Sequence, residues 1–361
     1  MKLVIAGGGT GGHIFSGVAV AQALKKIDPS ADILFVGTAL GLEKTAVPKA
    51  GFNIAFIQVS GLKGHSIKRK LRSLFSLPLA VFHSIHILRK FKADAVLGVG
   101  GYASGPTLLA AWVLRIPTAI CEQNSIPGFT NEILAYFSKQ IFGAFEKTAS
   151  FFPARKFFLV GNPLRQDLIL TPHSRSFSQK PYTLVVLGGS LGATPLNELL
   201  PPTLEILKSK GLLLNVIHQS GRKDADTLLK NYHTRHIQAE VFPFIDNMAR
   251  VYQKADLLIC RAGATTCAEV TALGVPSIMI PFPQAIYDHQ TENAKELTQA
   301  GAALSIPQVQ ATPSHLAEAI WNLCASPDTL ASMSNAAFKL ARVDAAQKIA
   351  QFALRRFKTS G

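Results

Sequence analysis

Several features of secreted, metal-binding and membrane-spanning proteins are scarce in this chain. Only four of its 361 residues are cysteines and none forms a CxxC pair, so neither a disulfide framework nor a cysteine zinc site is expected. Its apolar runs all stop short of the roughly 18 residues that a spanning helix needs. Its N-terminus opens on a strand pattern, without the charged, apolar and cleavage regions of a signal peptide. These absences predict a globular protein with free thiols that works in the cytoplasm.

Acidic residues are also scarce. The chain has 22 Asp and Glu against 37 Lys and Arg, which gives a net charge of +15. The imbalance is concentrated in residues 1–161, which hold 18 basic and 7 acidic side chains. A basic surface implies an acidic partner, which leaves phosphates, nucleic acid or an anionic membrane. The lack of an RNP-type aromatic motif or a zinc finger argues against nucleic acid.

Short β-branched runs alternate with helical patterns along the whole chain, which is too long for one ordinary core. This alternation predicts an α/β fold with two doubly wound, parallel-sheet (Rossmann-like) domains, whose ligands bind at the carboxyl ends of the strands. The expected strands are Val4–Ile5, Ile33–Val36, Ala95–Val99, Thr118–Cys121, Gln140–Phe142, Phe158–Val160, Thr183–Leu187, Leu213–His218, Gln238–Phe242, Leu257–Cys260 and Ser277–Ile280.

A turn-forming tripeptide, Gly161–Pro163, lies near the midpoint and marks the expected domain boundary. We therefore expect an N-terminal domain of residues 1–162 and a C-terminal domain of residues 163–343. The helical pattern of residues 344–361 is apolar on one face, so we expect this last helix to pack back on the first domain.

The first strand leads into six residues that include five glycines, Gly7–Gly12. Glycines this dense favour close approach of backbone N–H groups to a ligand at a helix start. The spacing satisfies GxGxxG, but the second strand ends in Gly37–Thr38, without the acidic residue that binds a dinucleotide ribose. A phosphate ligand is therefore favoured over NAD or FAD. His13 follows, where a neutral imidazole suits a general base or a phosphate donor, and a capping or core histidine is the alternative.

A second glycine turn, Gly188–Gly192, follows another apolar strand and opens another helix. One such turn in each domain indicates two phosphate-bearing ligands and hence a group-transfer enzyme. The same residues match the GxSxG motif of serine hydrolases, for which Asp256 and His289 are available to complete a triad. That alternative leaves the first turn without a role, so a phosphate cradle with Ser190 as an extra donor is favoured.

Further polar residues follow at two later helix starts. At one of them, the segment Arg261–Glu269 is rich in small residues. Glu269, about one turn into the helix, could accept hydrogen bonds from two sugar hydroxyls. An ordinary acidic residue in the first turn of a helix is the alternative. Gln290 and Asn293 share a helix face, and amides that both donate and accept suit a hydroxyl-rich sugar.

Metal binding is not expected. The DxD sequence Asp224–Asp226 falls in a polar helix start where acids are common. Two histidine pairs have no carboxylate or cysteine nearby in sequence and are interpreted as structural: His83 with His86, and His233 with His236.

The segment Gly61–Lys92 carries eight basic residues and no acidic one, beside many apolar side chains. A basic cluster next to exposed apolar groups can dock on an anionic leaflet, with about 1 kcal/mol from each cation near the surface. A solvated loop followed by a core helix is the plainer alternative.

Seven motifs, taken in order, resemble the MurG family of two-domain GT-B glycosyltransferases, and the resemblance runs essentially end to end. They are Gly8–His13, Gly98–Pro106, Glu122–Asn124, Gly161–Arg165, Gly188–Ser190, Arg261–Ala264 and Asp288–Ala294. The resemblance implies an inverting transferase of peptidoglycan synthesis, with a role in cell shape and division. It would move N-acetylglucosamine from UDP to the C4 hydroxyl of the muramyl sugar on undecaprenyl diphosphate (lipid I to lipid II) without a cofactor. A GT-B enzyme for another nucleotide sugar and lipid is the alternative.

The resemblance also implies binding residues, with the nucleotide sugar on the C-terminal domain. Uracil is expected at the Ile245 backbone, ribose at Glu269 and sugar at Gln290. The full donor set is Thr10, Gly11, Gly12, Asn124, Arg165, Ser190, Ile245, Ala264, Thr265, Thr266, Cys267, Ala268, Glu269, Gln290 and Asn293. The acceptor set, in the N-terminal domain, is Gly9, Gly100, Gly101 and Tyr102.

An inverting transfer needs a base for the acceptor hydroxyl and positive groups for the departing diphosphate. His13 is the first candidate for the base and Glu122 the second. Arg165 and the helix start after Cys260 would replace the metal that other glycosyltransferases use.

Two residues depart from the family pattern, Ser16 where proline is usual and Leu191 where a polar residue is usual. Neither change removes an expected catalytic group. Because the implied acceptor is a lipid, the resemblance also favours peripheral docking of Gly61–Lys92 on the cytoplasmic face of the plasma (inner) membrane.

Overall fold

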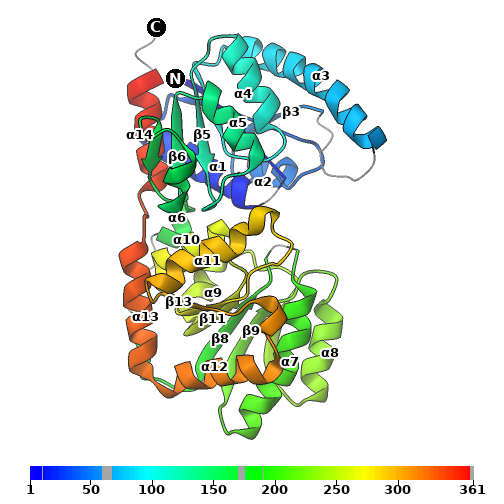
Figure 1. Ribbon diagram of the computed structural model, residues 1–361, viewed down its shortest axis with the longest axis vertical. Helices are drawn as coiled ribbons and strands as arrows, with labels where there is room; N and C mark the ends of the chain where they lie inside the picture. The colour runs from blue at the N-terminus through cyan, green and yellow to red at the C-terminus, as the bar shows by residue number, and fades with distance from the viewer. Residues whose placement is uncertain (10, 59–66, 170–174, 190, 358–361) are drawn as a thin grey trace. The chain divides into compact units, whose positions relative to one another are not determined.

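The computed structural model describes residues 1–9, 11–58, 67–169, 175–189 and 191–357, without the side chains of 67–76, 356 and 357. The chain forms two compact units (Figure 1): the N-terminal unit, Met1–Arg165 with Arg342–Gly361, and the C-terminal unit, Gln166–Ala341. Each unit has one parallel sheet covered by helices. The predicted fold class, two doubly wound α/β domains, is therefore confirmed.

The sheet of the N-terminal unit has seven parallel strands in the order β3-β2-β1-β4-β5-β6-β7. Its central strands are apolar and buried, as strands between two helix layers must be. The strands are β1 (Lys2–Ala6), β2 (Asp32–Gly37), β3 (Asn53–Phe56), β4 (Ala95–Gly98), β5 (Thr118–Glu122), β6 (Gln140–Gly143) and β7 (Phe157–Leu159). The helices are α1 (Gly11–Ile27), α2 (Glu43–Lys49), α3 (Ile67–Phe91), α4 (Ser104–Val113), α5 (Phe129–Phe137), η1 (Lys147–Phe151) and α14 (Ala345–Phe357).

The sheet of the C-terminal unit has six parallel strands in the order β10-β9-β8-β11-β12-β13. The strands are β8 (Tyr182–Leu187), β9 (Leu214–Gln219), β10 (Ala239–Phe242), β11 (Leu257–Cys260), β12 (Ser277–Met279) and β13 (Ala303–Ser305). The helices are α6 (Gln166–Ile169), α7 (Thr194–Ser209), α8 (Ala225–Thr234), α9 (Met248–Lys254), α10 (Ala264–Leu273), η2 (Ile286–Asp288), α11 (His289–Gln299), η3 (Gln308–Gln310), α12 (Pro313–Ala325) and α13 (Pro327–Leu340).

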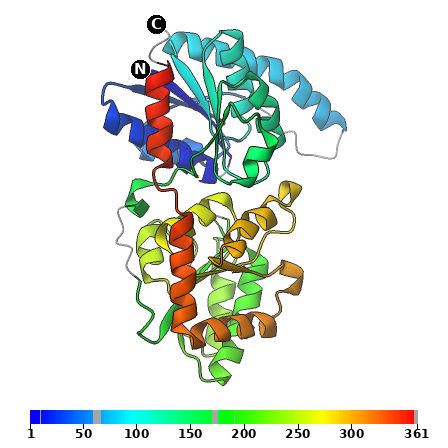
Figure 2. The ribbon, with the colours of Figure 1, turned by 60° about the vertical axis from the view of Figure 1, so that its left-hand side comes forward.

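The last helix, α14, completes the core of the N-terminal unit, although it is distant in sequence from the other elements of that core. It packs against α1, and Figure 2 shows it in red beside the blue N-terminal elements. Ile349 is 1% exposed and belongs to the same apolar cluster as Leu3 and Val18. One helix from the end of the chain therefore covers part of the first sheet.

The start of α1 also contacts residues 162–165, the last residues before the chain enters the C-terminal unit. The Ser16 hydroxyl is buried and lies 2.8 Å from both the Gly12 carbonyl oxygen and Asn162 Oδ1. One residue earlier, the Phe15 ring lies 5.3 Å from the guanidinium carbon of Arg165. Ser16, where the family resemblance leads us to expect proline, thus supplies a hydrogen bond for which proline has no donor.

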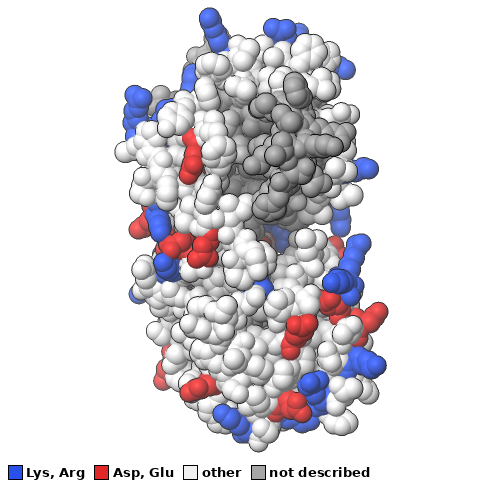
Figure 3. Space-filling view, turned by 45° about the vertical axis from the view of Figure 1, so that its right-hand side comes forward, with Lys and Arg blue, Asp and Glu red and all other residues white. Residues whose placement is uncertain are grey.

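Charged side chains of both signs are mixed on the face of the C-terminal unit seen in Figure 3. Among the residues that the structure describes, no helix combines the length and the apolar character needed to cross a bilayer.

Ile349→Ala tests the contribution of α14. Removing a fully buried aliphatic side chain creates a cavity, and we expect it to lower the free energy of unfolding of the N-terminal unit by about 3 kcal/mol. Gln347→Ala, on the exposed side of the same helix, should change that free energy by less than about 0.5 kcal/mol. Urea denaturation followed by circular dichroism measures both, and equal effects would contradict a core role for α14.

Candidate active site

In the glycine turn after β1, the first three backbone N–H groups all donate hydrogen bonds to other groups of the protein. Gly7 N donates to the Val36 carbonyl oxygen at 3.0 Å, and Gly8 N donates to the Gly100 carbonyl oxygen at 3.2 Å. Gly9, which has a φ of +90°, donates to the carboxylate of Glu43 at 3.0 Å. An anion at this turn must therefore find its donors further along, at the start of α1. Thr10 lies outside the described residues.

His13 lies on the first turn of α1, between two glycine turns. Its Nδ1 is 3.4 Å from the Gly8 carbonyl oxygen. Its ring faces Gly100, where a Cβ atom would come within 2.9 Å of Nε2. The close approach of backbone to both sides of the imidazole fixes the ring, and it explains why this part of the chain is rich in glycine.

The turn after β4 packs directly on the first one. Gly100 and Gly101 have φ values of +93° and +83°, and a Cβ on Gly101 would overlap the Gly8 carbonyl oxygen. The buried Ser104 hydroxyl accepts from Gly100 N at 3.1 Å and donates to the Ala6 carbonyl oxygen at 2.7 Å. Tyr102 remains 43% exposed. The structure thus brings Gly9, His13 and the Gly100–Tyr102 turn together.

Glu122, at the end of β5, is a buried carboxylate with partners on both oxygens. Its Oε1 accepts from Asn124 N at 3.0 Å, and its Oε2 accepts from Gly128 N at 3.2 Å and Asn131 Nδ2 at 2.8 Å. Burial raises the pKa of Glu122, although these hydrogen bonds work in the opposite direction. This arrangement holds the turn that carries Asn124.

In the C-terminal unit, one buried side chain joins two predicted donor-binding segments. Gln219, at the end of β9, donates from Nε2 to the Gly189 carbonyl oxygen at 2.8 Å and accepts from Ile245 N at 3.0 Å. Its amide therefore links the second glycine turn to the predicted uracil site. In that turn Leu191 is 90% exposed, and Ser190 lies outside the described residues.

The helix α10 begins directly after β11 and carries most of the remaining predicted donor residues. Cys267 N donates to the Gly263 carbonyl oxygen, and the Cys267 side chain is buried. The N–H groups before this bond are those of Ala264, Thr265 and Thr266, in the first turn of the helix. Ala268, another predicted donor residue, follows Cys267 in the helix. Since these N–H groups precede the first intrahelical bond, they suit an anion.

Glu269 has a positioned carboxylate. The hydroxyl of Tyr252, on α9, donates to Glu269 Oε2 at 2.7 Å, and Tyr252 is fully buried. The Arg175 guanidinium donates to the Tyr252 carbonyl oxygen at 2.7 Å, which anchors the end of α9. One oxygen of Glu269 is thereby oriented by the protein.

The two predicted sugar-binding amides lie on α11 but differ in burial. Gln290 Oε1 accepts from Phe282 N at 2.9 Å. Asn293 is fully buried and donates to the Ala262 carbonyl oxygen at 3.1 Å, so it supports the loop before α10. In the connection between β12 and α11, Tyr287 and Asp288 adopt φ values of +53° and +52°. Two successive non-glycine residues in this region cost about 1–3 kcal/mol each, a form of strain that clusters at ligand sites.

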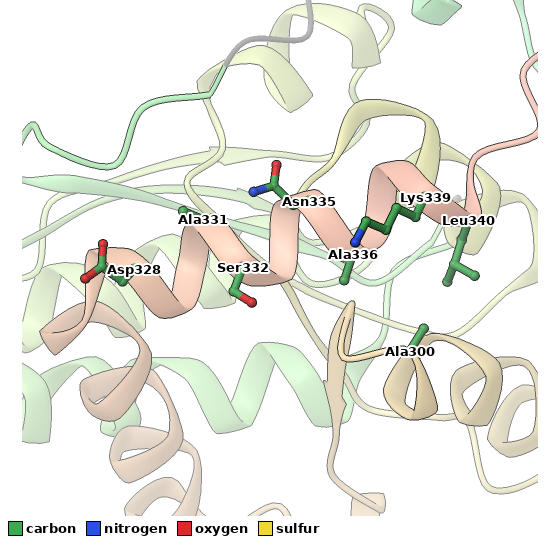
Figure 4. Close-up of a pocket in the computed structure, with 8 residues that line it drawn as sticks. All are labelled: Ala300, Asp328, Ala331, Ser332, Asn335, Ala336, Lys339 and Leu340. Carbon is green, nitrogen blue, oxygen red and sulfur yellow. The ribbon is translucent and has the colours of Figure 1, made fainter.

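A cavity of about 580 Å³ in the same unit lies along α13, with Ala300 at the end of α11 on its wall (Figure 4). Its polar lining includes Asp328, Asn335 and Lys339. None of the predicted site residues lines it, so it is separate from the site built by α10 and the glycine turn.

Comparison with known proteins identifies the family of the chain. The profile of the glycosyltransferase family 28 N-terminal domain matches residues 3–143, and that of the family 28 C-terminal domain matches residues 183–349. The chain is 44% identical to a UDP-N-acetylglucosamine--N-acetylmuramyl-(pentapeptide) pyrophosphoryl-undecaprenol N-acetylglucosamine transferase of Myxococcus xanthus strain DK1622, over 97% of this chain and 91% of that protein. A protein of the same name from Syntrophus aciditrophicus strain SB is 43% identical over 97% of both.

The crystal structure of Acinetobacter baumannii MurG superimposes with a TM-score of 0.78 at 33% identity, covering 97% of this chain and 98% of that one. The chain belongs to the MurG family. A UDP-GlcNAc 2-epimerase from Neisseria meningitidis, at 13% identity and a TM-score of 0.72, shares the fold alone.

Membership of the MurG family leaves no support for the serine hydrolase alternative, and the geometry opposes it as well. Asp256 accepts from Thr183 N at 2.7 Å, so it lies at the start of β8 and β11. The Gly188–Gly192 turn lies at the opposite end of β8, where ligands bind in parallel sheets. The proposed triad is therefore not assembled.

The DxD sequence also has a structural explanation. Asp224 accepts from the Thr194 hydroxyl at 2.6 Å and from Asn197 Nδ2 at 2.9 Å, and it precedes α8. Asn197 in turn lies 3.0 Å from Nε2 of His218, whose Nδ1 is 2.7 Å from the Tyr232 hydroxyl. This buried network supports the Ser220–Gly221 turn on which Gly192 packs.

Sequence reasoning missed three buried side chains of the site: Glu43, Gln219 and Tyr252. In the sequence, Gln219 is marked only as a polar residue at the end of a strand, and Glu43 only as an acidic residue in the first turn of a helix. Tyr252 carries no signal, because an aromatic residue in a short amphipathic helix is ordinarily core.

His218→Gln tests the buried network through pH. Burial lowers the pKa of His218 to about 3, so the folded state stays neutral while the unfolded histidine, with a pKa near 6.5, takes up a proton. This contribution to stability is present above pH 6.5 and is lost as the pH falls. We expect the wild type to lose about 2 kcal/mol more unfolding free energy than the variant between pH 7 and pH 5. Parallel losses in urea denaturation would contradict the assignment.

Proposed function

We propose that this protein transfers N-acetylglucosamine from UDP-GlcNAc to the C4 hydroxyl of the muramyl sugar of undecaprenyl-diphosphate-MurNAc-peptide, with inversion at the anomeric carbon. The observation that carries the proposal is the 43–44% identity, over 97% of the chain, to proteins named for this transfer.

The donor site that we propose is on the C-terminal unit. The first-turn N–H groups of α10 and the Gly188–Gly192 turn suit the diphosphate, and the oriented carboxylate of Glu269 suits the ribose hydroxyls. Ile245 N is already bonded to Gln219, so the Ile245 carbonyl oxygen is the better-placed group for uracil. Arg165, whose guanidinium lies against Phe15, would add positive charge for the departing UDP.

The acceptor site that we propose is on the N-terminal unit, and His13 is the base. If Nδ1 carries its proton toward the Gly8 carbonyl oxygen, Nε2 is the basic nitrogen. It takes the proton from the C4 hydroxyl as that oxygen bonds to the anomeric carbon, and the bond to UDP breaks with its electron pair leaving on the diphosphate. Glu122, with both oxygens bonded inside the protein, serves as the support of the neighbouring turn.

We further propose that the protein acts at the cytoplasmic face of the plasma membrane, as a lipid acceptor requires. The described part of α3 exposes Leu77, Leu79 and Phe82, which are 41%, 49% and 68% exposed. They follow the basic sequence of the Gly61–Lys92 segment. Apolar side chains beside cations are the combination that binds an anionic leaflet.

A direct assay with radiolabelled UDP-GlcNAc and a lipid I analogue tests the transfer. We expect a disaccharide-lipid product, formed equally well with a chelator present. His13→Ala should lower kcat by at least about 100-fold while the KM for UDP-GlcNAc stays near the wild-type value, because it removes the base. Glu269→Gln should raise the KM for UDP-GlcNAc about tenfold, because it weakens a hydrogen bond to a charged group.

The two variants are controls for each other, since one acts on the rate and the other on donor binding. Near-normal turnover in His13→Ala would dismiss it as the base. Competition by UDP-glucose or UDP-galactose as strong as that by UDP-GlcNAc would favour a different donor sugar, and no product under any condition would overturn the proposal.

Membrane docking is tested by Phe82→Ser. Losing this exposed ring should lower partitioning to vesicles that contain anionic lipid by about tenfold, since burying a phenylalanine side chain contributes about 1.5–3 kcal/mol. Leu213→Ser is the matched control, because Leu213 is 67% exposed against 68% for Phe82 but lies in the C-terminal unit. Vesicle sedimentation measures both, and equal losses would remove α3 as the docking element.

A further inference from the structure

Glu43 is a fully buried carboxylate beside the first glycine turn, and the proposed reaction does not use it. It is the first residue of α2. Its Oε2 accepts from Gly9 N at 3.0 Å, while its Oε1 accepts from Thr38 N at 2.9 Å and from the Thr38 hydroxyl at 2.8 Å. Both carboxylate oxygens therefore accept hydrogen bonds, one from the glycine turn and the other from Thr38, directly after β2.

The chain leaves space for this carboxylate by omitting three side chains. A Cβ atom on Gly8 or on Gly41 would overlap the carboxylate oxygens of Glu43. A Cβ atom on Gly37 would come within 2.7 Å of its Cγ. Gly8 in the first glycine turn, Gly37 at the end of β2 and Gly41 before α2 thus leave a pocket of the size of one carboxylate.

The charge of Glu43 is the opposite of what a phosphate cradle needs. Burial alone would raise the pKa of Glu43, but the hydrogen bonds from Gly9 and Thr38 outweigh it and the pKa is lowered, so the group is ionised at neutral pH. A buried anion in contact with Gly9 repels a second anion there. With the N–H groups of Gly7, Gly8 and Gly9 all bonded inside the protein, the first half of the turn offers little to a diphosphate.

We propose that Glu43 is a positioning residue for the acceptor: by holding Gly9 N–H inward it directs the acceptor diphosphate to the N–H groups at the start of α1, beside His13. The proposal rests on the proposed function, because it places the acceptor of that reaction. It assigns to Gly9 a role in shaping the turn, and it gives the acceptor the N–H groups of Gly11 and Gly12, which the family resemblance implied for the donor.

Glu43→Gln separates this role from bulk packing. The variant keeps the shape of the side chain, but whichever way the amide is oriented, its NH2 group faces an N–H donor, either that of Gly9 or that of Thr38. We expect the KM for the lipid I analogue to rise at least fivefold and kcat to fall, with the KM for UDP-GlcNAc within twofold of the wild type. Thr38→Val is the matched control, because it removes one bond to Glu43 and leaves the Gly9 contact intact; all its constants should stay within twofold.

Hydrogen–deuterium exchange of the peptide spanning residues 3–14 gives a readout independent of turnover. Exchange should accelerate in Glu43→Gln and not in Thr38→Val, at temperatures well below both thermal midpoints. Glu43→Asp, which keeps the charge on a shorter stem, should lie between the wild type and Glu43→Gln. Unchanged exchange in Glu43→Gln, or a donor KM that rises with the acceptor KM, would overturn the proposal. An inactive wild type with the expected exchange pattern would instead count against the proposed function.

Discussion

The structure depends on how closely backbone can approach backbone at the carboxyl ends of parallel strands. In the N-terminal unit the turns after β1 and β4 meet there, and a side chain on Gly101 would overlap the Gly8 carbonyl oxygen. In the C-terminal unit a side chain on Gly192 would overlap the Ser220 carbonyl oxygen. Glycine is the residue that permits both contacts and the positive φ values that accompany them. The positions of His13 and of the Gly188–Gly192 turn follow from this packing.

Much of the fold was predictable, because its central strands are unbroken apolar runs. The two strands that sequence reasoning missed, β3 and β13, both lie at sheet edges. Their sequences, Asn53–Phe56 and Ala303–Ser305, are short, and their residues are largely half-buried or exposed. An edge strand needs a neighbour on one side only, so its pattern is weak and its pairing is decided by the rest of the sheet.

The sequence marks His13, Arg165 and Glu269 as candidates because each lies within a motif, and their roles stay predictions. The candidate site was not predictable where a side chain acts across the fold. Gln219 joins two segments that follow different strands, and Tyr252 reaches Glu269 from another helix. Such contacts depend on which strand ends become neighbours, and strand order is not written in local pattern. Likewise, the buried state of Asn293 depends on the loop that folds over it.

The hydroxyl of Ser16 has a single hydrogen and two equidistant acceptors, the Gly12 carbonyl oxygen and Asn162 Oδ1. Only one of them can receive it at a time. Both acceptors lie in the N-terminal unit, so the buried hydroxyl has a partner in either orientation. The serine thus joins the first helix to the Gly161–Arg165 segment of its own unit, and a side chain without a hydroxyl would lose that hydrogen bond.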